Sequence, residues 1–373
     1  MNLCLPVSLA ERLKDFIQRK GPITFHDWMQ AALYDRQGGY YQRSDLARWG
    51  RSGDYRTSPE RSELFAATFA RYFAGLYEEL QRPAEWTIVE CGAGNGTFAS
   101  GVLHTLSTHY SSVFAATRYV IHDLSADASR RAGERLAEFG DRVQFVTELP
   151  AVEYGVYFSN ELLDAFPVHR VVKKDGELAQ LYVNVGADGN FEWLVGPSTT
   201  LFSEFIQAYS LDLFEGQIVE INLEIDDWFT HVSQKLASGF VVTVDYGAEA
   251  GELYDPTLRP NGTLRAFSRH GFVDDVLAHP GEYDITASVN WTQVKSVGER
   301  LGLQVVEFTS QDKFLLQEGL LEEMEYRLRG IDSEAERLRL STAAREMILP
   351  GGMASTFQVL VQRRIEEGAA NVA

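Results

Sequence analysis

Cysteine is nearly absent from this chain, which has only Cys4 and Cys91 among its 373 residues. Two cysteines can build neither a disulfide framework nor a cysteine zinc site, so a reducing compartment, the cytoplasm, is the expected location. No apolar run approaches the roughly 18 residues that a membrane-spanning helix needs. The first residues also lack the basic segment followed by an apolar stretch that marks a secretion signal. We therefore expect neither a membrane span nor secretion.

The chain also lacks an excess of basic residues. It has 34 lysines and arginines against 53 aspartates and glutamates, which gives a formal charge of −19. Phosphate backbones require a basic surface, so this balance excludes nucleic acid as an expected partner. The acidic surface favours solubility, with a basic protein partner as the alternative. Hydrophobic residues make up 45% of the chain, which predicts a folded protein with a substantial core rather than a disordered one.

The most informative stretch is the turn from Glu90 to Thr97. It follows the strand-like run 86–89 and precedes the helix-like run 98–103. Its three glycines are Gly92, Gly94 and Gly96. Glycines let the backbone turn sharply and leave amide N–H groups uncovered at a helix N-terminus, where partial positive charge favours a carboxylate or a phosphate. We expect a negatively charged group of a ligand to bind here.

The spacing of the glycines discriminates between ligands. A dinucleotide-binding loop has Gly or Ala at the sixth position of its fingerprint, whereas this loop has Thr97 there. A nicotinamide oxidoreductase is therefore disfavoured. From Glu90 the loop runs Glu-x-Gly-x-Gly-x-Gly, the pattern associated with S-adenosylmethionine (SAM). A lone glycine loop is a weak signal, and a tight turn without a ligand is the alternative.

A second strand-like run, residues 118–122, ends at Asp123. A carboxylate at this place suits the two hydroxyls of a ribose across the switch point of a doubly wound sheet, so Asp123 is the ribose candidate. The alternative is that Asp123 caps Ser125 and the helix after it, because Asp is favoured at helix starts.

Strand and helix patterns alternate from residue 86 onward, which predicts parallel strands joined by right-handed crossovers. Further strands are expected at 142–146, 155–159 and 239–244. Between the last two, the runs 181–185 and 191–195 flank a glycine-containing turn and predict a β-hairpin.

The final hundred residues predict an edge to this sheet. The runs 303–308 and 356–361 are expected to pair as antiparallel strands, as mixed doubly wound sheets allow. A helical segment, 320–347, lies between them. Its apolar stripe is expected in the core, with a homodimer seam as the alternative; the stripe comprises Met324, Leu328, Ile331, Leu338 and Leu340.

The first eighty residues predict a helical cap. Ser8 and Glu11 form a capping box, and Thr24 opens a second helix. After Gly38-Gly39, a loop containing Tyr40, Tyr41 and residues 53–60 is expected to lie over the cofactor, with Tyr40 as a contact. The alternative for both tyrosines is a place in the hydrophobic core, where aromatic residues are more often found.

These patterns predict an α/β protein of Rossmann-like fold, with a doubly wound, mostly parallel sheet, an N-terminal helical cap and a β-rich insertion. The expected division places the cap and lid at 1–80 and the SAM-binding core at 81–170. The insertion with its hairpin occupies 171–238. The remainder of the core occupies 239–373, and its loop 250–295 is expected over the site.

Polar residues follow two of the predicted strands at their carboxyl ends, where chemistry is expected in such a sheet. Asn160, Glu161 and Asp164 follow the strand 155–159, and Asp245 follows the strand 239–244. We expect the four to meet at the mouth of the cofactor cleft, with Asn160 also touching the cofactor. If 161–164 is a helical turn, its two acids share one face. The alternative is that Asn160 caps a short helix whose first turn favours the acids.

Eight ordered blocks carry a resemblance to a known family, at residues 21–25, 33–41, 53–60, 90–96, 160–168, 245–247, 262–267 and 284–287. In these blocks the chain resembles the MidA family of SAM-dependent methyltransferases nearly end to end. Two departures stand out: Cys-Gly-Ala-Gly-Asn at 91–95 replaces the family's usual Leu-Gly-Pro-Gly-Arg, and Asn290 stands where an aspartate is usual.

The resemblance implies a SAM-dependent methyltransferase fold, SAM as cofactor and a protein substrate. Eukaryotic members of the family are mitochondrial factors that methylate an arginine on a subunit of the respiratory NADH dehydrogenase during its assembly. We therefore expect a protein arginine methyltransferase. The alternative is an assembly or interaction factor that keeps the SAM fold without turnover.

The chemistry of the donor defines what the site must do. A sulfonium methyl group is already activated, so the protein must hold the reactants in line and exclude water, which is worth on the order of 7–11 kcal/mol. No metal is needed. Carboxylates in a fork geometry can orient a guanidinium, which assigns this role to Glu161, Asp164 and Asp245, with Asn160 placing the acceptor. A basic loop containing Arg265, Arg269 and His270 is expected to be solvated, with His270 as a general base as the alternative.

Overall fold

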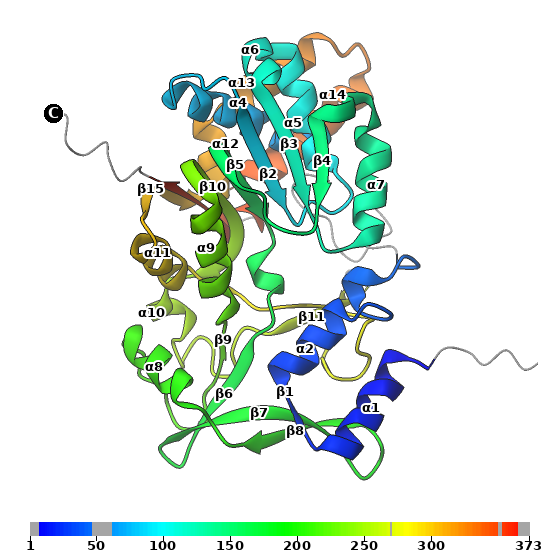
Figure 1. Ribbon diagram of the computed structural model, residues 1–373, viewed down its shortest axis with the longest axis vertical. Coiled ribbons are helices and arrows are strands. Elements are labelled where there is room, and N and C mark those ends of the chain that lie inside the picture. The colour runs from blue at the N-terminus through cyan, green and yellow to red at the C-terminus, as the bar shows by residue number, and fades with distance from the viewer. Residues whose placement is uncertain (1–6, 47–61, 269–270, 350–352, 365–373) are drawn as a thin grey trace, which may run out of the picture. The chain divides into compact units, whose positions relative to one another are not determined.

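The computed structural model describes residues 7–46, 62–268, 271–349 and 353–364 (Figure 1). The chain groups into two compact units. The first unit comprises residues 1–55, 163–227 and 248–294, and the second comprises 56–162, 228–247 and 295–373. Each unit is therefore assembled from three separated segments, which differs from the four consecutive segments expected above. Among the described residues, no helix is long and apolar enough to cross a membrane.

The second unit is built on one large sheet with the path β15-β16-β10-β5-β2-β3-β4. Its strands are β2 (Trp86–Cys91), β3 (Thr117–His122), β4 (Val143–Val146), β5 (Val152–Asn160), β10 (Leu236–Ala248), β15 (Leu303–Ser310) and β16 (Phe357–Arg364). The strands from β10 to β4 pair in parallel, and β16 is antiparallel to both β10 and β15. This order confirms the predicted doubly wound sheet with an antiparallel edge. The direction of winding reverses between β2 and β5, which is the switch point.

Helices of the second unit follow the strands in the predicted alternation. They are α4 (Glu63–Glu79), α5 (Thr97–His109), α6 (Ser111–Ala116), α7 (Ala126–Leu136), α12 (Gln311–Gln317), α13 (Leu320–Arg329) and α14 (Glu334–Ile348). Two further helices, α9 (Glu224–Lys235) and α11 (Trp291–Arg300), have residues in both units. Short 3-10 turns lie at η2 (Ala137–Arg142) and η4 (Met353–Thr356).

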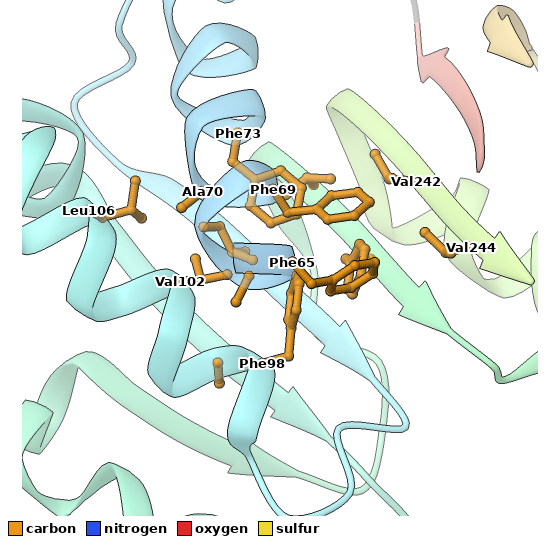
Figure 2. Packing of buried hydrophobic residues seen from close by; sticks show 14 of the residues in the cluster. Phe65, Phe69, Ala70, Phe73, Phe98, Val102, Leu106, Val242 and Val244 are labelled. Atoms are coloured by element: carbon orange, nitrogen blue, oxygen red, sulfur yellow. The ribbon is translucent and has the colours of Figure 1, made fainter. Parts of the chain in front are cut away.

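The core beneath the glycine turn is aromatic. The side chains of Phe65, Phe69 and Phe73 on α4 point toward α5 and the sheet (Figure 2). Phe98, in the first turn of α5, stacks on Phe158 of β5 with ring centroids 4.3 Å apart. Burying side chains of this size stabilises the fold by about 1.5–3 kcal/mol each. The start of α5 is therefore fixed against the sheet by its own first aromatic residue.

The apolar stripe at 320–347 lies on two helices rather than one. The chain breaks at 330–333, where Ser333 caps α14 by accepting a hydrogen bond from the amide of Glu336. Met324 and Leu340 are partly buried against the core, as expected. Leu338 is 68% exposed, so its prediction as a core residue is wrong. The break changes the helical phase, and Ala344 and Met347 provide the fully buried contacts of α14 instead.

The first unit combines helices with two smaller sheets. Its helices are α1 (Leu9–Lys20), α2 (Phe25–Tyr34), α8 (Thr200–Ala208) and α10 (Ala250–Leu253), with 3-10 turns at η1 (Tyr40–Gln42) and η3 (Leu163–Ala165). One sheet has the path β1-β7-β6-β9, with β8 paired to β7, and the other has the order β12-β11-β13. The strands are β1 (Ile23–Thr24), β6 (His169–Lys174), β7 (Glu177–Val185), β8 (Phe191–Gly196), β9 (Ile218–Ile221), β11 (Arg265–Ser268), β12 (Gly271–Phe272) and β13 (Asp284–Thr286); a short strand β14 (Val289–Asn290) follows.

Several local predictions for the first unit are confirmed. Ser8 and Glu11 form the capping box of α1, and Thr24 caps α2 by accepting from an amide of its first turn. The hairpin predicted at 181–195 is formed by β7 and β8, with Val185 opposite Phe191. Residues 53–60, Arg269 and His270, for which roles were predicted, lie outside the described residues.

Candidate active site

The three glycines of the turn have backbone conformations that only glycine adopts without strain. Gly92, Gly94 and Gly96 have φ angles of +72°, +56° and +74°, in the left-handed region that disfavours other residues. A Cβ added to Gly96 would lie 2.9 Å from the Cβ of Ala132 on α7. Glycine is therefore required at this position both by its conformation and by the close approach of α7.

The amides of the turn are mostly engaged within the protein. Four of them donate to the protein itself, from Gly92 to His122 O (2.9 Å), Gly94 to Asp123 Oδ2 (3.0 Å), Gly96 to Ala93 O (3.1 Å) and Thr97 to Asn95 Oδ1 (3.2 Å). The expectation that the glycine amides are uncovered is therefore wrong for all three glycines. The turn acts as a rigid, closely fitting backbone surface, and side chains around it must supply much of the ligand's polar contacts.

Asp123 holds two backbone segments together. Its Oδ2 accepts from the amide of Gly94, and its Oδ1 accepts from the amide of Ser125 at 2.8 Å. Ser125 in turn caps α7. Asp123 therefore has the role at the start of this helix that was given as its alternative. The ribose contact stays a prediction.

Glu90 lies at the end of β2, just before the turn, and is 5% exposed. The hydroxyl of Tyr119 donates to its Oε2 at 2.7 Å. Burial raises the pKa of Glu90 to about 8; the hydrogen bond from Tyr119 opposes the rise, and the charge of Asp123 adds to it. At neutral pH this carboxyl is therefore mostly protonated, and it adds little negative charge beneath the turn.

Asn160 ends β5, across the switch point from the glycine turn. Its Nδ2 donates to Glu161 Oε1 at 3.1 Å, which identifies its other terminal atom as the oxygen. That Oδ1 is buried, and no donor reaches it from the described residues. A buried acceptor without a donor is costly, so the site fits a ligand with an N–H group. The ammonium group of SAM is such a donor, and Asn160 would hold it.

Glu161 has a strained backbone. Its φ angle is +53°, although it is not a glycine, and its amide donates to Val244 O on the neighbouring strand at 2.9 Å. Residues held in this region cost of order 1–3 kcal/mol and cluster at functional sites. The strain turns the chain sharply after β5, and this turn brings the carboxylate of Glu161 beside Asn160.

Asp245 fixes that turn from the next strand. It is fully buried, its Oδ2 accepts from the amide of Leu162 at 3.2 Å, and its Oδ1 accepts from the amide of Tyr246 at 2.9 Å. The register pairs Val244 with Asn160. The structure thus brings Asn160, Glu161 and Asp245 together, with Asp245 bonded to the backbone that follows Glu161.

Asp164 belongs to the first unit. It is 4% exposed, and its carbonyl accepts from the amide of Ala287 at 2.9 Å. The 3-10 turn η3 begins at Leu163, so Glu161 lies outside it. Glu161 and Asp164 therefore do not share the face of one helical turn, the geometry considered from their spacing. A catalytic role for Asp164 stays a prediction.

Tyr40 lies in the hydrophobic core of the first unit and is fully buried. Its ring packs edge-on against Tyr41, with centroids 5.2 Å apart, and the hydroxyl of Tyr41 donates to Asp284 Oδ1 at 2.7 Å. These contacts favour the packing role that was the alternative for both tyrosines. The cofactor contact of Tyr40 stays a prediction.

Sequence reasoning did not single out three side chains with polar roles, Tyr119, Asn222 and Gln293. Tyr119 lies inside an apolar strand, where nothing distinguishes it from a core residue. Asn222 and Gln293 meet through a hydrogen bond across 71 positions of sequence. Within the described ranges, no group of three or more His, Cys, Asp or Glu residues has the arrangement of a metal site.

Curated relatives cover most of this chain. The protein arginine methyltransferase NDUFAF7 homolog, mitochondrial, of Drosophila melanogaster is 25% identical over 324 residues, which are 79% of this chain and 71% of the relative. The protein arginine methyltransferase NDUFAF7, mitochondrial, of Danio rerio is 25% identical over 386 residues, which are 94% of this chain and 86% of the relative.

Solved structures show the same fold. A superfamily member from Burkholderia thailandensis, crystallised with S-adenosyl-homocysteine, is 30% identical, with a TM-score of 0.84 over 95% of this chain and 92% of that one. A native structure from the same organism gives a TM-score of 0.82 at 30% identity, over 95% and 91% of the two chains. A family model matches residues 68–309. The chain belongs to the family that this model describes, the S-adenosyl-L-methionine-dependent methyltransferases, for which the sequence resemblance was found.

Proposed function

We propose that this protein transfers the methyl group of SAM to an arginine of a partner protein. One observation supports this most strongly: the strained turn at Asn160-Glu161 presents an amide oxygen and a carboxylate at the switch point beside the glycine turn. The relatives in Drosophila melanogaster and Danio rerio are named protein arginine methyltransferases. A carboxylate at this place suits a cationic acceptor.

The cofactor supplies an activated sulfonium methyl group. The glycine turn would face its amino-acid end, Asp123 its ribose and Asn160 its ammonium group. The rigid backbone of the turn, which is held by its own hydrogen bonds, fixes the donor without further reorganisation. Such positioning is the main contribution a protein can make to a methyl transfer.

Glu161 would orient the acceptor. A guanidinium is planar and always charged, and a carboxylate can accept two of its N–H bonds in parallel. The Oε1 of Glu161 is held by Asn160 Nδ2, and Asp245 holds the next amide along the chain. One carboxylate oxygen of Glu161 and the backbone that follows it are therefore held before the substrate arrives. The carboxylate can take up the proton that leaves the methylated nitrogen.

The partner is part of the proposal. The sequence resemblance supports a subunit of a respiratory-type complex as the substrate, and the net charge of −19 suits a basic surface on it. A cytoplasmic location and a homodimer stay predictions.

The test is transfer of labelled methyl groups from SAM into proteins of a cell lysate. We expect label in protein, recovered as methylarginine after hydrolysis. Glu161→Gln is expected to abolish labelling while the affinity for SAM changes by less than about twofold. Glu153→Gln, which alters an exposed glutamate on the same strand, is the control and should label normally.

Label in a small metabolite and not in protein would contradict the proposal. Bound SAM without any transfer would favour a non-catalytic assembly factor.

A further inference from the structure

The first unit has a sheet edge that is open. Strand β8 pairs with β7 over all six of its residues, without a shift of register. Among the described residues it pairs with no other strand. The far edge of the same sheet, β9, is closed by a loop, because the amide of Ile218 donates to the carbonyl of Pro260 at 3.0 Å. An open edge presents a row of N–H and C=O groups to which another chain can bind.

The hairpin turn fixes which groups of β8 face outward. The amide of Gly186 donates to the carbonyl of Asn190 at 2.8 Å, so these two residues form a hydrogen-bonded pair. Such pairs alternate along an antiparallel ladder with pairs that exchange no hydrogen bonds. Phe191, Trp193 and Val195 therefore belong to pairs of the second kind. Their N–H and C=O groups point away from β7, where an added strand can bond to them.

Strand β8 also lacks the features that protect sheet edges. Natural edges carry lysine or proline, contain a bulge, or are very short. The sequence of β8, Phe-Glu-Trp-Leu-Val-Gly, has neither residue, and its register is unbroken. The edge strand β15 of the second unit shows the contrast, because its register shifts between Val305 and Glu307. On β8, Leu194 and Val195 are 41% and 44% exposed, so an apolar surface accompanies the open backbone.

The chain around this edge is acidic. Residues 175–234, which include β7, β8 and α8, contain eleven aspartates and glutamates and no lysine or arginine. Asp188 in the hairpin turn and Glu192 on β8 are both exposed. A basic segment complements such a surface, whereas a second copy of this chain, which also carries a charge of −19, is repelled by it. The charge therefore favours a basic partner over self-association.

Two cations contact β8, and both lie over its aromatic rings. Lys14 and Arg170 lie over the rings of Phe191 and Trp193, at 5.4 and 4.8 Å from the ring centroids. Successive side chains of a strand point to opposite faces, so Glu192 lies on the other face of the strand. The two cations therefore do not lie on the face that carries Glu192.

We propose that β8 binds a basic, extended segment of the methyl-accepting protein as an added strand of the first unit's sheet. The outward N–H and C=O groups supply main-chain hydrogen bonds, and Leu194 and Val195 supply apolar contacts. Lysines and arginines of the segment are attracted by the surrounding acids, which speeds association and disfavours acidic partners. This inference rests on the proposed function and names a docking surface for its substrate, in addition to the residues that perform the transfer.

Two variants of the full chain test the edge. Val195→Pro removes an outward N–H group and leaves the bonds to β7 intact, and Leu194→Lys adds a positive charge to the edge. We expect each to raise the KM for the protein labelled in the lysate assay fivefold or more, while kcat and the Kd for S-adenosyl-homocysteine stay within about twofold. Leu258→Lys makes the same change at a 64% exposed leucine of the first unit that lies outside the sheets, and it should leave the KM within about twofold.

Hydrogen exchange of the wild type, resolved by residue with NMR, gives a readout that needs no variant. The probe is a synthetic peptide of alternating lysine and valine, and a peptide of alternating glutamate and valine is its control. We expect the lysine peptide to slow exchange at the outward amides of Phe191, Trp193 and Val195 tenfold or more, because they enter a ladder. The amides of Glu192 and Leu194 already bond to β7 and should change little. Unchanged exchange with the lysine peptide, or equal slowing by both peptides, would overturn the inference.

Further outcomes separate this inference from the proposed function. Methylarginine labelling with an unchanged KM in both edge variants would overturn the inference and leave the proposed function standing. A dimer in light scattering that Val195→Pro abolishes would assign the edge to a second copy and also overturn the inference. If the wild type labels only a metabolite, the proposed function falls first and the inference falls with it.

Discussion

The hydroxyl of Tyr119 donates a 2.7 Å hydrogen bond to Glu90, and both side chains are buried beneath the glycine turn. Burial raises the pKa of Glu90 to about 8, well above its ordinary value of 4.5. The protonated carboxyl is therefore the form that the folded protein prefers. This pair makes the stability of the second unit depend on pH.

Glu90→Gln tests that dependence. The folded pKa is raised, so the contribution of Glu90 to stability is fully present below about pH 4.5 and is lost as the pH rises toward about 8. The loss amounts to on the order of 3 to 5 kcal/mol. Because glutamine mimics the protonated acid, the variant should be similar to the wild type at low pH and more stable at pH 8 in urea unfolding. An identical pH profile for the two proteins would contradict the assignment.

Gly96→Ala is expected to destabilise the protein and to abolish binding of SAM. The left-handed φ costs roughly 1–2 kcal/mol for a residue with a Cβ, and that Cβ would meet the backbone of α7 at 3.0 Å. Gly75→Ala is the control, because a Cβ at Gly75 in α4 meets nothing within 4 Å. The control should be more stable by roughly 0.5–1 kcal/mol. Thermal unfolding and titration with S-adenosyl-homocysteine measure both effects, and equal outcomes for the two alanines would refute the argument.

Glu161→Gly separates strain from function. Glycine relieves the backbone strain at φ +53°, so the variant should be as stable as the wild type or more stable by up to about 1 kcal/mol. Methyl transfer should nevertheless be lost with the carboxylate. Asp175→Gly relieves a similar φ of +54° in the exposed turn between β6 and β7 and should keep full activity. A fully active Glu161→Gly would move the acceptor role to another residue.

The ionisation of His26 should make the stability of the first unit depend on pH as well. Its ring bonds to Asp27 and Glu224, which raises its pKa to about 9, and it stacks on His169 with centroids 4.5 Å apart. The stability from this group is full below about pH 6.5 and is lost as the pH rises through about 9, by about 1 kcal/mol after allowance for solvent screening.

NMR titration measures the coupling between the two histidines. Burial, together with the charge of His26, lowers the pKa of His169 to about 4. His26→Gln should therefore raise the pKa of His169, and Glu224→Gln should lower that of His26. A pKa of His169 that does not respond to His26→Gln would show that the stacked rings are not electrostatically coupled.

Local sequence signals predicted most of the fold. The strand, glycine turn and helix around residues 86–103 were visible because the glycines occupy left-handed positions that no other residue fits well. The hairpin at 181–195 could be predicted because a glycine-containing turn separates two strand-like runs. Long-range relationships were less accessible: the break at 330–333, which exposes Leu338, depends on how α13 and α14 each meet the core.

The candidate site was predicted in part. Asn160, Glu161 and Asp245 were identified because the carboxyl ends of adjacent parallel strands meet. The left-handed backbone of Glu161 was not foreseeable, since glutamate does not favour it.

A crystal structure of the wild type with S-adenosyl-homocysteine tests the central claim most directly. We predict density for the ligand against the backbone of residues 92–96, with its ammonium group on Asn160 Oδ1 and its ribose on Asp123. Ligand bound elsewhere on the chain, or Asn160 Oδ1 occupied by water while the ligand is bound, would contradict the account.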